Sequence, residues 1–398
     1  MTKREEGKPD PLRLTLDLLK TFSAAELELE DVELEFDELE LEILPGRVRL
    51  LPRIAKEKLK PLQIIEMPYT APKQEYPGRI VEVRLGATRA EGGTRARSIT
   101  IGGETSPPLY FFHSKPPNLP VIAFDVFDTP KVSLPGAVRK QVSEVREDPG
   151  AWAEYCVEKF SADMINLHLV SIDPLIDDTP PEKALKTVES VLEAVDVPIA
   201  VGGCGDPAKD LRVFERIAQN TEGERILFNS VTLDMDIEKT ANLIKKHNHT
   251  VIAFTSMDMN RARELNRKLY EFLPRENIVM DTTTAALGYG LDYAFTVMER
   301  SRLAALKGDQ ELQHPISSGT TNAWAAREAW MTMDNMWEPK DLRGPLWELT
   351  TALTLLLAGV DYFMMMHPAA AQTLRGVIEA IGRQNRQTDP VEWTRLRI

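Results

Sequence analysis

The sequence predicts an α/β fold, a (β/α)8 TIM barrel that carries a β-rich N-terminal extension. From about Val121 onward, short runs of β-branched and aromatic residues alternate with longer stretches at helical spacing. Runs such as VIAF and TVIAFT are apolar throughout, which is typical of parallel strands buried on both faces. Eight such units occupy roughly 260 residues, close to the length of about 250 that a closed barrel needs.

Each barrel unit can be assigned to a range. The predicted strands are Val121–Phe127, Met164–Val170, Ile199–Gly202, Arg225–Ser230, Thr250–Thr255, Asn277–Asp281, Pro315–Ser318 and Asp361–Met366. The predicted helices lie around residues 149–160, 181–195, 208–219, 236–247, 259–272, 290–307, 323–357 and 369–383. Strands that alternate with helices favour parallel pairing, because parallel neighbours need a crossover connection. A doubly wound open sheet is the alternative, but it usually has fewer strands.

The first 115 residues follow another pattern. Residues 12–22 have the spacing of a short amphipathic helix, and from Leu27 to Ile43 apolar residues alternate with acids. A dominant period of two predicts half-buried strands, with bulges or a turn where the alternation slips. Two further strands are predicted over Arg79–Leu85 and Arg97–Ile101, around a glycine-rich turn. We therefore divide the chain into a β-rich extension (1–115), the barrel (116–385) and a C-terminal tail (386–398).

The negative charge of the chain is concentrated in that extension. Forty-eight basic and 61 acidic side chains give a formal charge of −13. Ten of the acids lie between Glu26 and Glu42, where there is no basic residue, so the remaining 51 acids nearly balance the bases. Such a charge distribution does not suit a nucleic-acid partner. The acidic segment is explained by a solvated strand face or, less simply, by docking to a basic surface of another subunit.

The number of cysteines limits the metal cofactors that the chain can hold, and its hydropathy limits the cellular compartment that we expect for it. Two cysteines, Cys156 and Cys204, cannot supply the four ligands of an iron–sulfur cluster or of a cysteine-rich zinc site. The N-terminus lacks the apolar core of a signal peptide. The most apolar stretch, residues 353–366, is short for a membrane span and contains Asp361. We expect a cytoplasmic protein without a membrane partner.

Polar residues gather at the predicted C-terminal ends of the strands, where the ligands of such barrels bind. Small hydroxyl residues, glycines and acids are frequent at these ends, whereas Lys and Arg are scarce. This composition favours a broad ligand that is approached by backbone and hydroxyl groups rather than a phosphate clamp. For any single residue, an equally good interpretation is that an Asp or Ser caps the helix that follows.

No catalytic or metal-binding motif accompanies these residues. His168 occupies an alternating strand position, where a structural role is as good an interpretation as a functional one. There is no HExxH or nucleophile-elbow pattern. The run Gly202–Pro207 permits a close backbone approach but lacks the spacing of a dinucleotide fingerprint, and Cys204 within it is better explained as a small packed residue. Trp and Met residues between 324 and 337 indicate core or an interface.

Five segments of the chain resemble a single known family. They are SITIGGETSPPLYFFHSKPPNLPVIAFDVFD, ADMINLHLVSIDP, VPIAVGGCGDPAKD, NIVMDTTTAALGYGLDYAFTVMERSRLAALKGD and DYFMMMHPAAAQTL, in collinear order over about residues 98–383. These segments resemble the small subunit of the corrinoid/iron–sulfur protein, which in methanogens is the delta subunit of the acetyl-CoA decarbonylase/synthase complex. The long N-terminal extension is more similar to the archaeal form than to the shorter bacterial one.

The resemblance implies a TIM barrel that pairs with a larger gamma subunit, in a complex that also contains acetyl-CoA synthase and CO dehydrogenase subunits. The gamma subunit would hold the iron–sulfur cluster, so this chain needs none. A cobamide, which is a corrinoid, would lie between the two subunits over the barrel's C-terminal mouth. It would carry a methyl group between a methyl-tetrahydropterin and the acetyl-CoA synthase centre in reversible acetyl-CoA synthesis and cleavage. This chain would be a non-catalytic or accessory subunit that shields and orients the cofactor.

Barrel geometry, rather than the resemblance, selects the residues that we expect at the cofactor. They are Asp125, His168, Gly203, Asn229, Asp281, Thr283, Thr284, Gly319, Thr320, Met366 and His367. We assign no catalytic residue and no metal ligand. One alternative is a stand-alone pterin-dependent methyltransferase, in which Asn229, Asp258 and Asp281 would contact the pterin ring. Another is a structural subunit that does not touch the cofactor.

Overall fold

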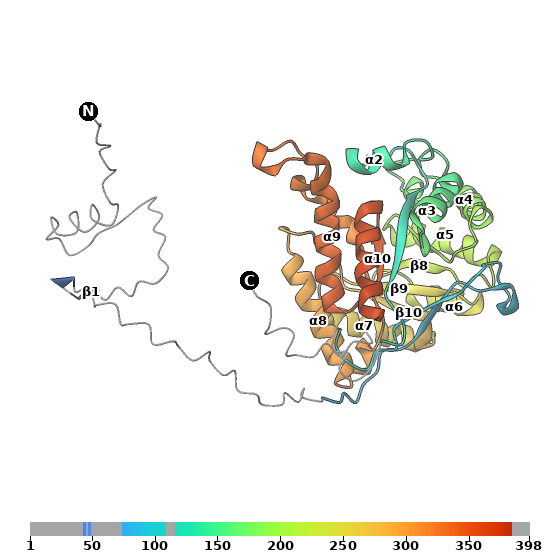
Figure 1. Cartoon of the computed structure of the whole chain (residues 1–398). Coiled ribbons are helices and arrows are strands. Elements are labelled where there is room, and N and C mark those ends of the chain that lie inside the picture. Colours follow the sequence, from blue (N-terminus) through green and yellow to red (C-terminus); the bar gives the residue numbers. More distant parts are fainter. Residues whose placement is uncertain (1–42, 45–46, 49–73, 109–115, 384–398) are drawn as a thin grey trace. The chain divides into compact units, whose positions relative to one another are not determined.

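The computed structural model describes residues 43–44, 47–48, 74–108 and 116–383 (Figure 1). The helix expected over residues 12–22, nearly all of the alternating acidic segment and the tail from residue 386 lie outside these residues. The chain separates into two compact units, residues 1–69 and 70–398. In the first unit, β1 (Ile43–Leu44) pairs antiparallel with β2 (Arg47–Val48). The expected division of the chain at residues 115 and 385 stays a prediction.

Eight parallel strands in the second unit close into a barrel. They follow one another around it in chain order, and the last pairs with the first. The strands are β5 (Val121–Phe127), β6 (Met164–His168), β7 (Ile199–Gly202), β8 (Leu227–Val231), β9 (Thr250–Phe254), β10 (Ile278–Asp281), β11 (Ile316–Ser318) and β12 (Val360–Met365). The predicted TIM barrel is confirmed, and every predicted barrel strand overlaps an observed one.

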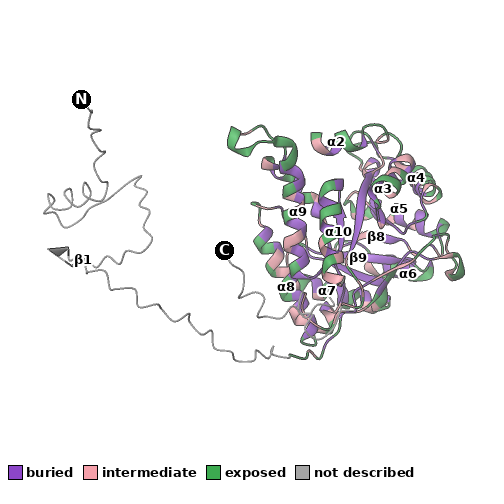
Figure 2. Cartoon of the chain, viewed as in Figure 1, coloured by how far each residue is buried: buried purple, intermediate pink, exposed green. Residues whose placement is uncertain are grey.

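Helices surround the barrel, with their outer faces exposed and the strands buried (Figure 2). They are α3 (Pro149–Phe160), α4 (Pro181–Ala194), α5 (Pro207–Asn220), α6 (Ile237–Lys246), α7 (Met259–Tyr270), α8 (Leu291–Leu306), α9 (Lys340–Ala358) and α10 (Pro368–Arg383). Four of these helices are capped by an aspartate whose carboxylate accepts hydrogen bonds from N–H groups of the first turn. The capping residues are Asp148 for α3, Asp206 for α5, Asp236 for α6 and Asp258 for α7. A short helix, α2 (Gly136–Val142), has no counterpart among the predicted elements. Within the described part of the chain, no helix combines the length and the apolar character needed to cross a membrane.

The helix predicted over residues 323–357 is wrong in its first half. The chain there forms three short 3-10 turns, Thr320–Ala325, Arg327–Ala329 and Asn335–Trp337, and α9 begins only at Lys340. Pro339 disfavours a helical backbone at the residue before it, and Pro339 itself is extended. The buried guanidinium of Arg343 donates to the carbonyl oxygens of Glu328 and Met331, which would have intrahelical partners in a continuous helix.

A hairpin closes the N-terminal end of the barrel. As predicted, two strands flank the glycine-rich turn: β3 (Val83–Leu85) pairs antiparallel with β4 (Ile99–Ile101). The side chains of Val83, Leu85 and Ile101 are fully buried and pack in one cluster with apolar residues of the barrel strands. Gly86 N–H donates to the carbonyl of Arg225, just before β8, which places the hairpin at the strands' N-terminal ends. The hairpin therefore covers the N-terminal ends of the strands and leaves their C-terminal ends to the loops that follow them.

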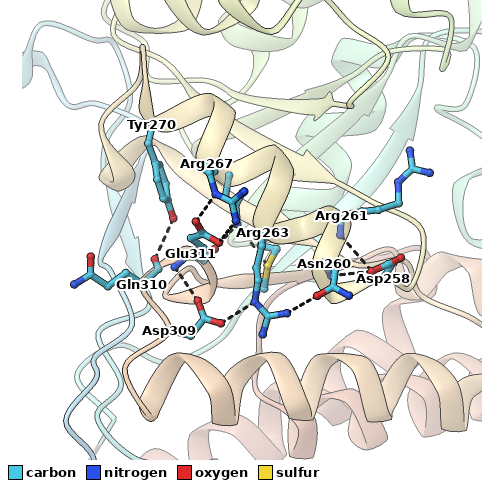
Figure 3. Close-up of polar contacts among 11 residues, drawn as sticks. Asp258, Asn260, Arg261, Arg263, Arg267, Tyr270, Asp309, Gln310 and Glu311 are labelled. Atoms are coloured by element: carbon cyan, nitrogen blue, oxygen red, sulfur yellow. Dashed lines mark hydrogen bonds and ion pairs between the residues drawn. The ribbon is translucent and has the colours of Figure 1, made fainter.

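A polar network fixes α7 to the turn that precedes β11 (Figure 3). Arg267 donates from Nε and Nη2 to the carboxylate of Glu311, at 2.6 and 2.9 Å. Arg263 Nε lies 2.8 Å from Asp309 Oδ2, and the Tyr270 hydroxyl donates to a carbonyl of the same turn. Because a two-pronged arginine–carboxylate contact fixes both position and orientation, we assign this network a structural role.

Candidate functional site

The inward face of the barrel changes from apolar to polar toward the C-terminal ends of the strands. Residues two apart on a strand share one face. The apolar interior cluster contains Ala123, Met164, Leu227 and Val279 of β5, β6, β8 and β10. Two residues further along, the inward positions hold Asp125, Asn166, Asn229 and Asp281. This upper polar layer, together with the loops above it, is the candidate site.

Asp125 is the most connected residue of this layer. Its buried carboxylate accepts from Asn166 Nδ2 at 2.7 Å, lies 3.0 Å from His168 Nε2, and accepts a hydrogen bond from the Thr321 hydroxyl. The His168 ring is 24% exposed and stacks on Phe127, with 5.0 Å between ring centroids. Burial lowers the pKa of His168, but the charge of Asp125, its hydrogen bond and the charge of Asp128 together outweigh burial, so the pKa is raised. The structure therefore brings two predicted residues, Asp125 and His168, into direct contact.

Asp281, the last residue of β10, is the second buried carboxyl group of the layer. Its Oδ1 accepts from Thr283 N–H at 2.7 Å, and its Oδ2 accepts from the Ser317 hydroxyl at 2.9 Å. Burial raises the pKa of Asp281 to about 6. Thr283 has a φ of 75°, and its hydroxyl donates to the carbonyl of Thr255 at 3.0 Å. Predicted residues Asp281 and Thr283 are thus directly joined, and their bonds fix the loop after β10.

A chain of hydroxyl groups lies beside this loop. The Ser318 hydroxyl is 2.8 Å from that of Thr284 and 2.9 Å from that of Thr320. Asn322 Nδ2 donates to the carbonyl of Thr284 at 2.9 Å, which links the loop after β10 to the loop after β11. Gly319, between the hydroxyl residues, has no contact closer than 3.5 Å at the position where a Cβ would be. The structure therefore brings Thr284, Gly319 and Thr320 to one place.

The glycine-rich loop after β7 wraps around a carboxylate of its own helix. Asp210, in α5, accepts from Cys204 N–H at 2.8 Å and from Gly205 N–H at 2.9 Å. A Cβ on Gly203 would lie 2.3 Å from Asp210 Cγ, which explains the glycine by packing. Gly203 N–H donates to the carbonyl of Asn229 at 2.8 Å, and Asn229 Nδ2 lies 3.5 Å from the sulfur of Met364. Gly203 thus has a structural explanation, whereas the amide of Asn229 stays half-buried at the mouth.

The end of β12 is held by a carboxylate that the sequence patterns do not single out. Glu348 of α9 is fully buried and accepts from Met366 N–H at 2.7 Å and from His367 N–H at 3.0 Å. Burial raises the pKa of Glu348 to about 7. The pKa of His367 is lowered to about 4, also by burial, so its ring is neutral at neutral pH. An isolated Glu in the apolar run around ELTTALTLLL is the signal that could have identified Glu348.

Charge near the mouth is locally compensated. Lys209 Nζ lies 2.5 Å from Asp178, and Lys131 pairs with Asp177. Three polar atoms on or next to the strand ends are buried without a hydrogen-bond partner in the structure, namely Asn166 Oδ1, Thr255 Oγ1 and Thr282 Oγ1. Among the described residues there is no group of three His, Cys, Asp or Glu side chains that could hold a metal ion. The layer thus combines the carboxyl groups of Asp125 and Asp281 with amide and hydroxyl groups, and the two lysines near it are paired with aspartates.

Comparison with known proteins places the chain in a family. Residues 82–338 match the family model described as CO dehydrogenase/acetyl-CoA synthase delta subunit. The acetyl-CoA decarbonylase/synthase complex subunit delta of Archaeoglobus fulgidus is 53% identical over 349 residues, covering 85% of this chain and 77% of the relative. The subunit of the same name from Methanocaldococcus jannaschii is 43% identical, covering 92% and 93% of the two chains.

Among solved structures, a dihydropteroate synthase of Xanthomonas albilineans is similar, with a TM-score of 0.47 and 14% identity over 67% of this chain and 94% of that one. The family assignment comes from the sequence matches, which extend over most of the chain. The predicted resemblance is confirmed: the chain belongs to the family of delta subunits of the acetyl-CoA decarbonylase/synthase complex.

Proposed function

We propose that this delta subunit holds one face of a cobamide at its barrel mouth, while a gamma subunit holds the other face. The cofactor would carry a methyl group between a methyl-tetrahydropterin and the acetyl-CoA synthase centre of the complex. The observation that carries the proposal is the upper polar layer. It lies over an apolar, plugged barrel and combines neutral amide and hydroxyl groups with buried polar atoms that lack partners.

The residues present suit a corrinoid. The periphery of a corrin ring bears amide side chains, which both donate and accept hydrogen bonds. Asn229 offers a half-buried amide, whereas the buried hydroxyl groups of Thr284 and Thr320 are bonded to Ser318 and would hold the loops beneath the ring. The Lys209 and Lys131 cations near the mouth are each paired with an aspartate.

When bound, the cobamide supplies the methyl-accepting and methyl-donating metal centre. This chain's own residues would then position and shield it. Gly319 leaves room for a flat ligand to approach the backbone, and the half-exposed amide of Asn229 lies on the inward face of β8. His168 lies 3.0 Å from Asp125, so its imidazole is held at a fixed place beside the mouth. Met366 and His367 are fixed through their N–H groups by Glu348.

The test is a bulky substitution where the structure has room for it. Gly319→Trp would place an indole over the mouth, whereas Gly376→Trp places one on the exposed surface of α10, where no atom lies within 4 Å of the added Cβ. Each variant would be reconstituted with the gamma subunit and cobamide, and corrinoid retained after gel filtration would be read from its absorbance. We expect Gly319→Trp to retain at least tenfold less corrinoid than Gly376→Trp.

Equal corrinoid retention by the two variants would refute the proposed site. Methyl transfer would be assayed in parallel, because loss of transfer should accompany loss of cofactor. Substantial methyl transfer from a methylpterin to free cob(I)alamin by the isolated chain would instead favour the stand-alone pterin-dependent methyltransferase.

A further inference from the structure

One imidazole stands at the upper end of the inward face of β6. Met164, Asn166 and His168 are two residues apart on this strand, so they share one face. Met164 belongs to the apolar interior cluster, and His168 ends the strand at the mouth. The side chain of His168 is 24% exposed, whereas the two residues below it are fully buried. His168 is therefore the β6 side chain that a ligand on the mouth meets.

Two contacts hold the His168 ring in place. One face stacks on Phe127, with an angle of 16° between the ring planes. Nε2 lies 3.0 Å from Asp125 Oδ1, and the other oxygen of this carboxylate accepts from Thr321 in the loop after β11. Asn166 Nδ2 is also 2.8 Å from Nε2, but the charged carboxylate is the stronger acceptor and keeps a proton on Nε2. The ring therefore gains or loses its second proton at Nδ1.

The Nδ1 atom is the open edge of this ring. Within the part of the chain that the structure describes, no group forms a hydrogen bond with it. It lies beside the end of β7, where a Cβ on Gly202 would be 3.2 Å away, so the glycine leaves Nδ1 uncovered. A polar atom that is fixed in direction and has no partner in the protein is a preorganised contact for a ligand.

Two carboxylates favour the protonated form of the ring. Strand β6 packs against β5, β7 and α3. The ionisable groups at or near these contacts are Asp125, Asp128, Cys156, Cys204 and Asp210. Burial raises the pKa of both thiols, so they are uncharged at neutral pH, and Asp210 is held by N–H groups of its own loop. Burial lowers the pKa of His168, but the charge and hydrogen bond of Asp125 and the charge of Asp128 raise it by more.

We propose that His168 donates a hydrogen bond from Nδ1 to an amide oxygen of the bound cobamide, an inference that rests on the proposed function. Asp125 is the positioning residue, because it orients the ring and stabilises the imidazolium. The acceptor is neutral and Asp125 balances the charge of the imidazolium, so the contact adds no net charge to the mouth. When the ring loses its proton, Nδ1 faces the amide oxygen with a lone pair, and the contact is lost. The cofactor then binds more weakly at high pH.

The test measures the affinity for a corrinoid and the charge of the imidazole separately. Each form of the chain would be reconstituted with the gamma subunit, and binding of cyanocobalamin would be measured by equilibrium dialysis at pH 6 and pH 8.5. The cobalt of cyanocobalamin has no open position, so His168 does not bind the metal instead. NMR titration of the imidazole, with and without cyanocobalamin, gives the pKa of His168.

Three substitutions separate the parts of the proposal. His168→Leu removes both ring nitrogens, and Asp125→Asn removes the carboxylate while keeping the shape of the side chain. Asp292→Asn is the matched control, because it makes the same exchange at an exposed position in the first turn of α8. Circular dichroism would show that each variant is folded before its affinity is compared with that of the wild type.

We expect the wild type to bind cyanocobalamin at least about fivefold more tightly at pH 6 than at pH 8.5, and bound cyanocobalamin to raise the pKa of His168, because the two effects are reciprocal. His168→Leu should bind equally at both pH values, and in Asp125→Asn the change in affinity should move to lower pH. Asp292→Asn should stay within twofold of the wild type at each pH.

A pKa of His168 that cyanocobalamin leaves unchanged or lowers would refute the contact, and so would a pH-dependent affinity in His168→Leu that equals that of the wild type. Either result would leave the proposed function standing. A pH profile of Asp125→Asn identical to that of the wild type would overturn the role of Asp125. Absence of cyanocobalamin binding by the reconstituted wild type would refute the proposed function itself.

Discussion

Glu348 makes the stability of this subunit depend on pH in an unusual direction. Its carboxyl group is fully buried, and burial raises its pKa from the ordinary 4.5 to about 7. A raised pKa means that the folded state binds the proton more tightly than the unfolded state does. Between about pH 4.5 and 7 the folded state therefore holds more protons, so its stability falls as the pH rises through that range and is level above it.

The size of this effect follows from the two pKa values. A difference of one unit corresponds to 1.36 kcal/mol. Between pH 5 and pH 8, the linkage relation gives a loss of about 2–3 kcal/mol of unfolding free energy from Glu348 alone. At high pH the two N–H groups of Met366 and His367 stabilise the carboxylate, which limits the loss but does not abolish it.

Glu348→Gln removes the titration and nearly preserves the shape of the side chain. Urea unfolding of the wild type and the variant at pH 5, 6, 7 and 8 would give the difference in unfolding free energy at each pH. We expect this difference to shift by about 2–3 kcal/mol in favour of the variant from pH 5 to pH 8. Glu299→Gln, at an exposed position of α8, should give a flat difference. A flat difference for Glu348→Gln as well would refute the reasoning.

Two further predictions concern the mouth. Gly203→Ala should lower the unfolding free energy by about 1–3 kcal/mol, because the added Cβ would lie 2.3 Å from the carboxylate carbon of Asp210. Gly376→Ala is the control and should not lower it, because no atom lies within 4 Å of its added Cβ. Urea unfolding measures the stability of both variants, and equal stability would contradict the packing explanation. Asp125→Asn should lower the pKa of His168, because burial then acts on the imidazole without its carboxylate partner. NMR titration of the imidazole measures that pKa. An unchanged titration midpoint would show that Asp125 does not set the charge of His168.

The barrel could be predicted from the sequence because its strands are marked by local signals. Buried parallel strands are short apolar runs, and several helices start at an Asp or Asp-Pro cap such as Asp206–Pro207. The segment before α9 could not be predicted in the same way. Its Trp, Met and Ala residues fit a helix, but the extended backbone of Ala326 and Pro339 and the long-range contacts of Arg343 favour short turns. Tertiary hydrogen bonds, which are invisible to local patterns, decide the outcome there.

The site shows the same division between local and long-range information. Alternation along a strand is enough to place Asp125, Asn229 and Asp281 on the inward face beyond the apolar cluster. It would also have identified Asn166, which lies opposite Asp125 in the register of β5 and β6. No alternation predicts that Glu348, on an outer helix, holds the end of β12. Helix residues enter the site through packing, and packing is set by the whole fold.

The acids of the mouth explain why a layer with several carboxyl groups can still suit a neutral ligand. Asp125 is compensated by His168 and by hydrogen-bond donors, Asp281 accepts from a hydroxyl and an N–H group, and Glu348 accepts from two backbone N–H groups. Each carboxyl group is thus occupied by the protein's own donors, and those partners are what make its burial tolerable. Of the other polar groups, the Asn229 amide is half-buried at the mouth, whereas the Thr284 and Thr320 hydroxyls are buried and bonded to Ser318. A broad, amide-bearing ring, as proposed for this mouth, would then be recognised through shape and neutral hydrogen bonds rather than through charge.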